Sequence, residues 1–198
     1  MLHTDARFNE TVATVVGEVE SRTDAEIVVV AAERSGNYRD LARTGAFVCA
    51  LLTLFGVMAV PFDVPAAMVF VDLLVSYALF AWLLGGRLPT RWLSSTARRR
   101  AQVGAAAAME FHLEAVHATP RRTGLLVYVS ALEGEVRLLP DVGLEEKIPA
   151  GLWHQARFGE DLDSFVAGLR EVGELLATHV PDVDGAEVVD LPNAPRVR

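Results

Sequence analysis

The acidic and imidazole side chains best suited to chemistry lie in and after an alanine-rich segment. Glu110, Glu114 and His117 are spaced four and three residues apart, so a continuous helix would place them on one face. Two carboxylates and an imidazole can bind a divalent cation, and oxygen ligands favour Ca²⁺ or Mg²⁺. Asp141, at the end of a predicted strand, is the candidate fourth ligand. The alternative is a solvated acidic helix face, with Asp141 forming a turn with Gly143.

Other polar residues have both functional and purely local interpretations. Glu20, Thr23 and Glu26 flank the start of a predicted strand, where they can form a site or simply cap a helix and begin the strand. Asp72 lies inside an apolar stretch, and a carboxylate in hydrocarbon is a candidate functional residue because its desolvation is unfavourable. It can pair across the stretch, be protonated or mark an oligomer contact. The sequence contains no glycine-rich phosphate loop, nucleophile elbow or Cys/His zinc spacing.

The apolar stretch itself covers residues 44–84 and organises the whole chain. Residues 61–65, with a proline at each end, divide it into two runs of about 20 residues, the length at which an α-helix crosses a bilayer. Asp63 and Asp72 are its only acidic residues, and it contains no Lys or Arg. The sequence therefore predicts a transmembrane helical hairpin rather than two core helices of a soluble protein.

The distribution of charge predicts the orientation of this hairpin. The formal net charge is −8, and the acidic soluble part argues against binding to nucleic acid. Arginines precede the first apolar run and follow the second: Arg34, Arg39, Arg43, Arg87, Arg91, Arg98, Arg99 and Arg100. By the positive-inside rule, both ends of the hairpin face the cytoplasm. The predicted location is the plasma (inner) membrane, with two spans and with both termini and the soluble domain in the cytoplasm.

The remaining residues predict a single α/β domain. Residues 25–32 and 124–131 are short apolar runs typical of buried strands, and residues 135–139 return from the second as a hairpin. Because helices separate the first two strands, we expect them to pair in parallel in a small mixed sheet with helices packed on it. Helices are predicted over residues 6–20, 97–118, 149–158 and 163–180.

The predicted organisation therefore has four parts. Residues 1–43 form the first part of the domain, with a helix and the first strand, and residues 44–84 form the transmembrane hairpin. Residues 85–180 form the second part, with the long helix, the β-hairpin and two further helices. Residues 181–198 contain Pro, Asp, Asn and Gly without an apolar period, and we expect a flexible tail.

Two pieces of the sequence resemble the TPM domain family, in its membrane-anchored bacterial form. Residues 20–29 resemble the family's opening helix end and first strand, and residues 123–143 resemble its apolar strand, charged turn, second strand and D-x-G turn. The residues that match these motifs are Glu20, Thr23, Glu26, Gly124, Glu133 and Gly143. The chain departs from common members in residues 115–124, where they read W-G-I-G before N-N-G. It departs also in carrying its spans inside the domain rather than after it.

The resemblance implies an α/β sandwich with a mixed sheet. Some members of the family are credited with phosphatase activity and divalent-metal binding, whereas others are accessory factors of membrane complexes. Since no catalytic set is recognisable, we expect a non-enzymatic accessory module whose partners are the lipid bilayer and membrane or cytoplasmic proteins, including a second copy of the chain. The alternative is a metal-dependent, phosphatase-like hydrolase that uses Glu110, Glu114 and Asp141. A third interpretation, a transporter or channel subunit, would require oligomers, because two spans cannot enclose a pathway.

Overall fold

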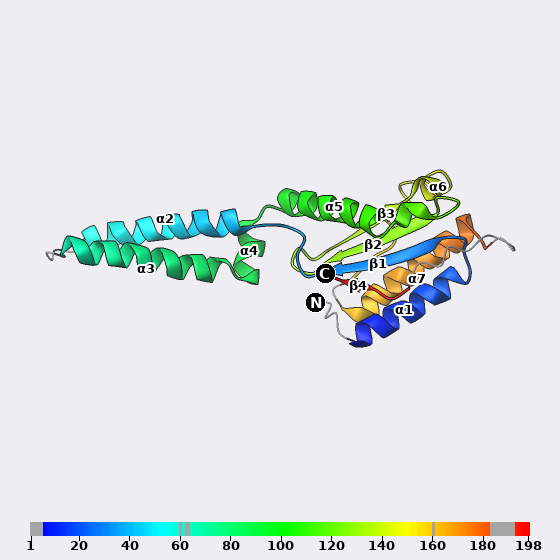
Figure 1. Ribbon diagram of the computed structural model, residues 1–198, viewed down its shortest axis with the longest axis horizontal. Coiled ribbons are helices and arrows are strands. Elements are labelled where there is room, and N and C mark those ends of the chain that lie inside the picture. Colours follow the sequence, from blue (N-terminus) through cyan, green and yellow to red (C-terminus); the bar gives the residue numbers. More distant parts are fainter. Residues whose placement is uncertain (1–5, 60, 62–63, 160, 183–192) are drawn as a thin grey trace. The chain divides into compact units, whose positions relative to one another are not determined.

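The computed structural model describes residues 6–59, 61, 64–159, 161–182 and 193–198. The chain forms two compact units (Figure 1). The first, called here the sheet unit, combines Met1–Ser35 with Arg100–Arg198. The second, the hairpin unit, is Gly36–Arg99. In chain order, the hairpin unit therefore interrupts the sheet unit.

A four-stranded mixed sheet with strand order β3-β2-β1-β4 forms the centre of the sheet unit. β1 (Glu26–Ala32) pairs in parallel with β2 (Gly124–Ser130), and β2 pairs antiparallel with β3 (Glu135–Pro140). All of β2 and all but the first residue of β1 are buried, which explains why both read as continuous apolar runs. The predicted α/β class, the parallel pair and the returning strand are confirmed.

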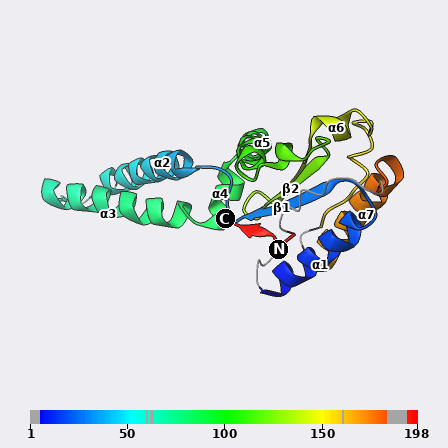
Figure 2. The same ribbon diagram turned by 45° about the vertical axis from the view of Figure 1, so that its right-hand side comes forward.

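Helices cover both faces of the sheet, because successive residues of a strand point to opposite sides. Odd-numbered residues of β1 pack with α1 (Ala6–Glu20) and α7 (Leu162–His179) in one hydrophobic cluster. Even-numbered residues pack with α5 (Thr96–Leu113) and the 3₁₀ helix η1 (Val116–Ala118) in a second cluster. Figure 1 shows α5 on one side of the sheet and the α1–α7 pair on the other, and Figure 2 shows the same arrangement from a second direction.

The predicted long helix over residues 97–118 is wrong at its C-terminal end. α5 ends at Leu113, and Ala115 adopts a left-handed conformation with φ 53°. This reversal lets Val116 enter the core, where it is fully buried beside the start of β2. Burial of an apolar side chain explains why an alanine accepts an unfavourable backbone conformation here.

The predicted helix over residues 149–158 is also wrong. A four-residue helix, α6 (Val142–Glu145), lies earlier, and residues 150–155 form successive turns. Their hydrogen bonds join residues three apart, from Leu152 N to Pro149 O and from Gln155 N to Leu152 O. Gly151 disfavours a helix at this position. Leu152 packs against the core cluster, and the segment covers that cluster as a series of turns.

The end of the chain is part of the sheet rather than a flexible tail. β4 (Arg196–Val197) pairs in parallel with β1, with Val30 opposite Arg196 and Ala31 opposite Val197. The prediction of a tail over residues 181–198 is therefore wrong for this last segment, and residues 183–192 lie outside the described residues. This short strand pairs with the edge of β1 that β2 does not occupy.

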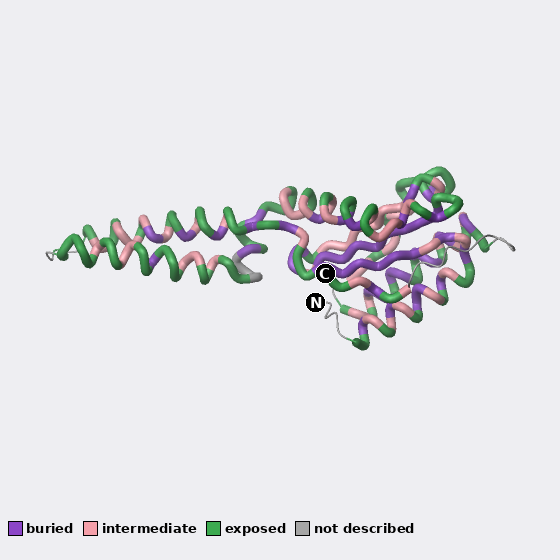
Figure 3. Tube along the Cα trace, viewed as in Figure 1, coloured by how far each residue is buried: buried purple, intermediate pink, exposed green. Residues whose placement is uncertain are grey.

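Two long helices dominate the hairpin unit, α2 (Arg39–Met58) and α3 (Ala66–Leu84). They lie side by side, and α2 turns the small residues Ala42, Ala46 and Ala50 inward. Large apolar residues are exposed on both helices; Phe55 is 68% exposed and Trp82 is 77% exposed. Figure 3 shows that exposed positions recur along the length of both helices. Both helices are long and apolar enough to cross a membrane.

Candidate functional site

The two glutamates predicted to bind a metal lie near the edge of the sheet and face the end of the chain. Glu110 lies in the last turn of α5, and Glu114 follows that helix directly. Arg196 donates from Nε to Glu114 Oε2 at 2.7 Å, and Arg198 donates from Nη2 to Glu114 Oε1 at 2.7 Å. Arg198 Nε also lies 3.5 Å from Glu110 Oε2. We call these four residues the C-terminal clamp.

Sequence spacing explains why the clamp forms. Two residues at i and i+4 share a helix face, and two residues at i and i+2 share a strand face, so both pairs can meet. Glu114 and Arg196 are largely buried, with 12% and 19% of their side chains exposed. Ion pairs in such surroundings are screened less than those on the surface. The clamp thus ties α5 to β4, and its two positive charges already compensate the two carboxylates.

Asp141 forms a separate pair. It caps α6 by accepting from Val142 N at 2.9 Å, and Arg122 binds both of its carboxylate oxygens. Burial alone would raise the pKa of Asp141, but the hydrogen bonds from Arg122 and Val142 and the charges of Arg122 and His117 outweigh it, so the pKa lies below its ordinary value. The carboxylate therefore stays ionised as a structural anchor.

His117 does not share a helix face with the glutamates, because the chain reverses at Ala115. Its ring lies against Phe111 and His112, with centroid distances of 6.3 and 5.3 Å. Its buried Nδ1 has no hydrogen-bond partner in the described part of the chain. His117 thus belongs to a small aromatic cluster on the α5–η1 turn.

The four predicted ligands do not form one site. Within the described residues, no three His, Cys, Asp or Glu side chains gather closely enough to hold a metal ion. Glu114 and Asp141 each accept two hydrogen bonds from arginine guanidinium groups, so a divalent cation would have to displace these positive charges. The residues present therefore do not fit a divalent cation.

The motif residues near the start of β1 form hydrogen bonds with backbone groups. Glu20 Oε1 accepts from Ile27 N at 2.8 Å, and Thr23 donates to the carbonyl of Val180. Glu26 N donates to Thr123 O at 3.3 Å. The side chain of Glu20 thus binds the start of β1, the side chain of Thr23 binds the residue after α7, and the bond of Glu26 is made by its backbone.

A hydroxyl network that the sequence analysis missed lies at the other end of the parallel strands. Ser35 bonds with Tyr128 Oη at 2.9 Å and donates to Ser130 Oγ at 2.6 Å, and Ser130 donates to Glu133. Burial raises the pKa of Tyr128, reinforced by the charges of Glu110 and Glu133 and opposed by the bond with Ser35. The sequence signal that could have indicated this network is the spacing of Tyr128 and Ser130, which lie two residues apart and so share one face of the strand.

The remaining predicted residues have distinct environments. Gly124 and Gly143 both lie where another backbone segment passes close to them. A Cβ on Gly124 would meet Val116, and a Cβ on Gly143 would lie 2.7 Å from Arg122 O. Asp72 is half-buried in α3, and no described residue hydrogen-bonds or ion-pairs with it. Its position inside a candidate span is confirmed, whereas its role stays a prediction.

Comparison with known proteins defines the fold alone. No protein-family model matches the chain, and no curated protein matches it. Among solved structures, the chain is similar to the NMR structure of BA42 protein from the psychrophilic bacterium Bizionia argentinensis. The TM-score is 0.58 at 15% sequence identity, over 98% of this chain and 94% of the other. The likeness therefore extends over nearly the whole of both chains and concerns their architecture.

Proposed function

We propose that this chain is a membrane-anchored, TPM-like accessory protein that binds a partner protein in a membrane complex and has no enzymatic activity of its own. The observation that carries the proposal is the place of the hairpin, in the connection between the parallel strands β1 and β2. Its helices expose large apolar side chains such as Phe55 and Trp82, a surface suited to lipid. The two hydrophobic clusters of the sheet unit include no hairpin residue, so anchoring leaves the sheet unit complete.

The proposed topology follows from the same insertion. Because β1 and β2 pair directly, the two ends of the hairpin must return to one side of the bilayer, and two spans satisfy this requirement. The arginines before and after the spans favour the cytoplasmic side of the plasma membrane. In this arrangement the tip near Val64 faces outward, and the sheet unit with both termini is cytoplasmic.

Cysteine labelling in intact cells tests the topology. Cys49 is the chain's single cysteine, so a Cys49→Ser background allows one new cysteine at a time. We expect a membrane-impermeant maleimide to label Val64→Cys and to leave Lys147→Cys unlabelled until the cells are opened. Lys147 is the matched control because it is exposed in the sheet unit. Labelling of Lys147→Cys in intact cells, or release of the protein by alkaline carbonate, would contradict the proposal.

The absence of enzymatic activity is supported by the clamp and by the Arg122–Asp141 pair, which use the candidate catalytic carboxylates for structure. Phosphatase assays with Mg²⁺, Mn²⁺ or Ca²⁺ should give no turnover above background. Turnover that disappears in Glu110→Ala, Glu114→Ala and Asp141→Ala variants that remain folded would establish the hydrolase alternative instead.

Partner binding is tested by photo-crosslinking in native membranes from probes on the exposed surface of the sheet unit. We expect one or a few proteins, or a second copy of the chain, to be captured reproducibly. Probes at the hairpin tip provide the matched control. Capture of the same abundant proteins by both sets of probes would remove the support for an accessory role.

A further inference from the structure

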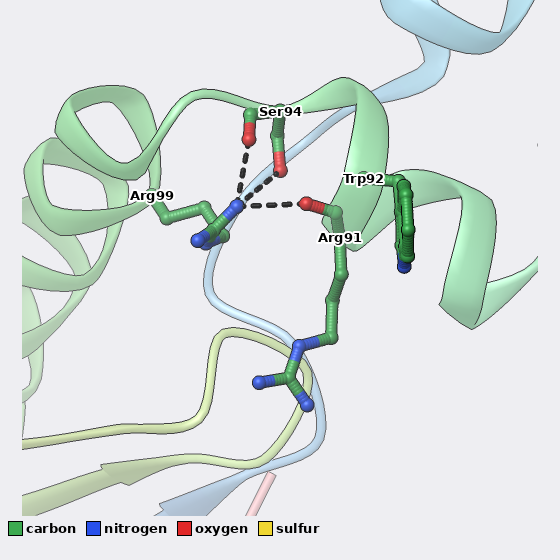
Figure 4. Close-up of a pocket in the computed structure, with 4 residues that line it drawn as sticks. All are labelled: Arg91, Trp92, Ser94 and Arg99. Carbon is green, nitrogen blue, oxygen red and sulfur yellow. Dashed lines mark hydrogen bonds between the residues drawn. The ribbon is translucent and has the colours of Figure 1, made fainter.

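A cavity of about 510 Å³ opens in the hairpin unit beside α4 (Arg87–Leu93). It is lined by Arg91, Trp92, Ser94 and Arg99 (Figure 4). Arg99 comes from the first turns of α5, and the other three residues come from α4 and the position after it. The volume lies within the range of pockets that hold small ligands, about 300–1,000 Å³. The guanidinium group of Arg99 faces this cavity, and its positive charge points to an anionic ligand.

Arg99 is held in place without a counter-ion. Its Nη1 donates to the carbonyl oxygen of Arg91 at 2.8 Å and to that of Ser94 at 2.6 Å, as Figure 4 shows. Its Nη2 lies 3.4 Å from Thr96 Oγ1. All of these acceptors are neutral, and no carboxylate among the described residues pairs with Arg99. The positive charge is therefore fixed in position and left uncompensated.

The neighbouring arginine shows the contrast. Arg98 donates from Nη1 and Nη2 to the two carboxylate oxygens of Asp40 at 2.8 and 2.9 Å. Its charge is therefore neutralised within the hairpin unit. Adjacent arginines thus have different functions: Arg98 closes an internal ion pair, and Arg99 contributes its charge to the cavity.

The cavity also lies close to the expected end of the membrane. α4 follows α3 after only Gly85 and Gly86, so its residues lie at headgroup depth if α3 spans the bilayer. Trp92 is 89% exposed beside the cavity. Exposed tryptophan at the end of a span is typical of the interface between hydrocarbon and water. Basic pockets beside spanning helices on the cytoplasmic side are typical sites for anionic lipid headgroups.

We propose that this cavity binds the phosphodiester group of an anionic glycerophospholipid in the cytoplasmic leaflet. The remaining N–H groups of the Arg99 guanidinium would bind the phosphate oxygens, for which planar guanidinium geometry is well suited. Trp92 would lie against the glycerol and upper acyl region. This inference rests on the proposed membrane anchoring. It adds a second role for the arginine-rich segment, which would bind a lipid as well as determine the orientation of the hairpin.

The test is lipid binding by the full-length protein purified in a neutral detergent and followed by native mass spectrometry. Phosphatidylglycerol, phosphatidylcholine and inorganic phosphate are titrated in separate arms. We expect one phosphatidylglycerol to be retained at concentrations where phosphatidylcholine and inorganic phosphate are not. Arg99→Gln should weaken this binding at least about tenfold, the effect of losing one charge-assisted hydrogen bond. Arg99→Lys, which keeps the charge but loses the fork, should be intermediate.

Arg43→Gln is the matched control, because Arg43 is exposed on α2, belongs to the same basic end of the hairpin and does not line the cavity. It should change lipid binding little. If Arg99→Gln lowers the unfolding temperature, because its side chain also holds the α4–α5 turn, Trp92→Ala supplies the deciding measurement, since Trp92 lines the cavity and is exposed. If Arg43→Gln and both cavity variants lose lipid binding to the same extent, non-specific electrostatic attraction explains the binding, and the proposal is overturned.

The other arms separate the remaining outcomes. Retention of inorganic phosphate as strong as that of phosphatidylglycerol would assign the cavity to a soluble phosphate and overturn the lipid assignment. Equal retention of phosphatidylcholine would also overturn it. Alkaline carbonate extraction of the same variants distinguishes this failure from failure of the anchoring. Protein that stays in the membrane without selective lipid binding refutes only the lipid site, whereas released wild-type protein refutes the anchoring as well.

Discussion

Arg122 holds Asp141 through two parallel hydrogen bonds, from Nε to Oδ2 at 2.6 Å and from Nη2 to Oδ1 at 2.8 Å. Arg122 itself has a positive φ of 56°, and its carbonyl accepts from Gly143 N at 2.9 Å. One arginine thus fixes the loop before β2 to the turn after β3, through its side chain and its backbone. The turn at Asp141 and Gly143, which resembles the D-x-G turn of the TPM family, therefore joins two loops of the sheet unit in this chain.

Asp141→Asn tests this junction through pH. Asparagine keeps the helix cap but loses the charge, so we expect a loss of about 1–3 kcal/mol in the free energy of unfolding at pH 7. The folded-state pKa of Asp141 is lowered, so its stabilisation is present above the unfolded pKa of about 3.9 and disappears as pH falls through the folded value. In urea titrations from pH 7 to pH 2.5, the difference between wild type and variant should therefore shrink as pH falls below about 3.9. A difference that is the same at pH 7 and at the lowest pH would contradict the ion-pair explanation.

Gly143→Ala tests the close approach at the same turn. A Cβ at this position would lie 2.7 Å from Arg122 O, which forces the backbone to shift, and we expect destabilisation of about 1–3 kcal/mol. Gly151→Ala is the matched control, because a Cβ there meets nothing within 4 Å. Thermal unfolding of both variants measures the difference. Equal melting temperatures would show that the loop relaxes without loss.

Arg196→Gln tests the C-terminal clamp. The change leaves the largely buried Glu114 with one hydrogen bond fewer, and we expect a loss of about 1–3 kcal/mol in the free energy of unfolding. Arg170→Gln serves as control, because its pair with Glu18 is long, at 3.7 Å, and exposed, so its loss should stay below about 1 kcal/mol. Hydrogen exchange should also accelerate at Arg198 N, which donates to Ala31 O. Similar effects from both variants would show that the clamp is no stronger than a surface pair.

Removal or addition of divalent cations should leave stability unchanged. A ligand that binds only the folded state raises the unfolding temperature by mass action, and the arginines on Glu114 and Asp141 leave no vacant carboxylate pair for Ca²⁺ or Mg²⁺. Melting curves in EDTA and in millimolar Ca²⁺ or Mg²⁺ should coincide. A cation-dependent shift that Glu110→Gln abolishes would show that the cation displaces the arginines.

A hairpin deletion tests the independence of the sheet unit. Replacement of residues 44–84 by a short flexible linker should give a soluble, folded protein, because both hydrophobic clusters consist of residues outside the hairpin unit. Circular dichroism and gel filtration measure the outcome, and the Gly124→Val variant of the same deletion provides an unfolding control, since its side chain would collide with Val116. An aggregated deletion product would mean that the hairpin is needed for the core.

The parts of the fold that the sequence predicted are those with a local pattern. The runs that became β1 and β2 were recognisable because burial on both sides leaves only apolar residues, and the separation by helices predicted parallel pairing. The apolar period of α7 was equally clear, with Phe165 and Leu169 buried as expected. Each of these signals lies within a few turns or one strand.

The features that the sequence did not predict depend on partners far apart in the chain. The Glu114–Arg196 contact joins residues 82 positions apart, and neither neighbourhood contains a repeat that indicates the other. The left-handed Ala115 could not be predicted from its own preferences, because burial of Val116 determines it. The candidate metal site failed in part for the same reason: spacing placed Glu110 and Glu114 on one face, but the arginines that bind Glu114 come from the end of the chain.

The pairing of β1 with β2 has a consequence for the order of synthesis. β1 leaves the ribosome before either helix of the hairpin, and its partner follows only after both helices are complete. Under the proposed anchoring, the hairpin enters the bilayer while β1 still has two unpaired edges. Unpaired strand edges are prone to aggregation, and only α1 has been made early enough to cover a face of this strand. If the chain is anchored as proposed, membrane integration precedes closure of the sheet, and the final two-residue strand is added last of all.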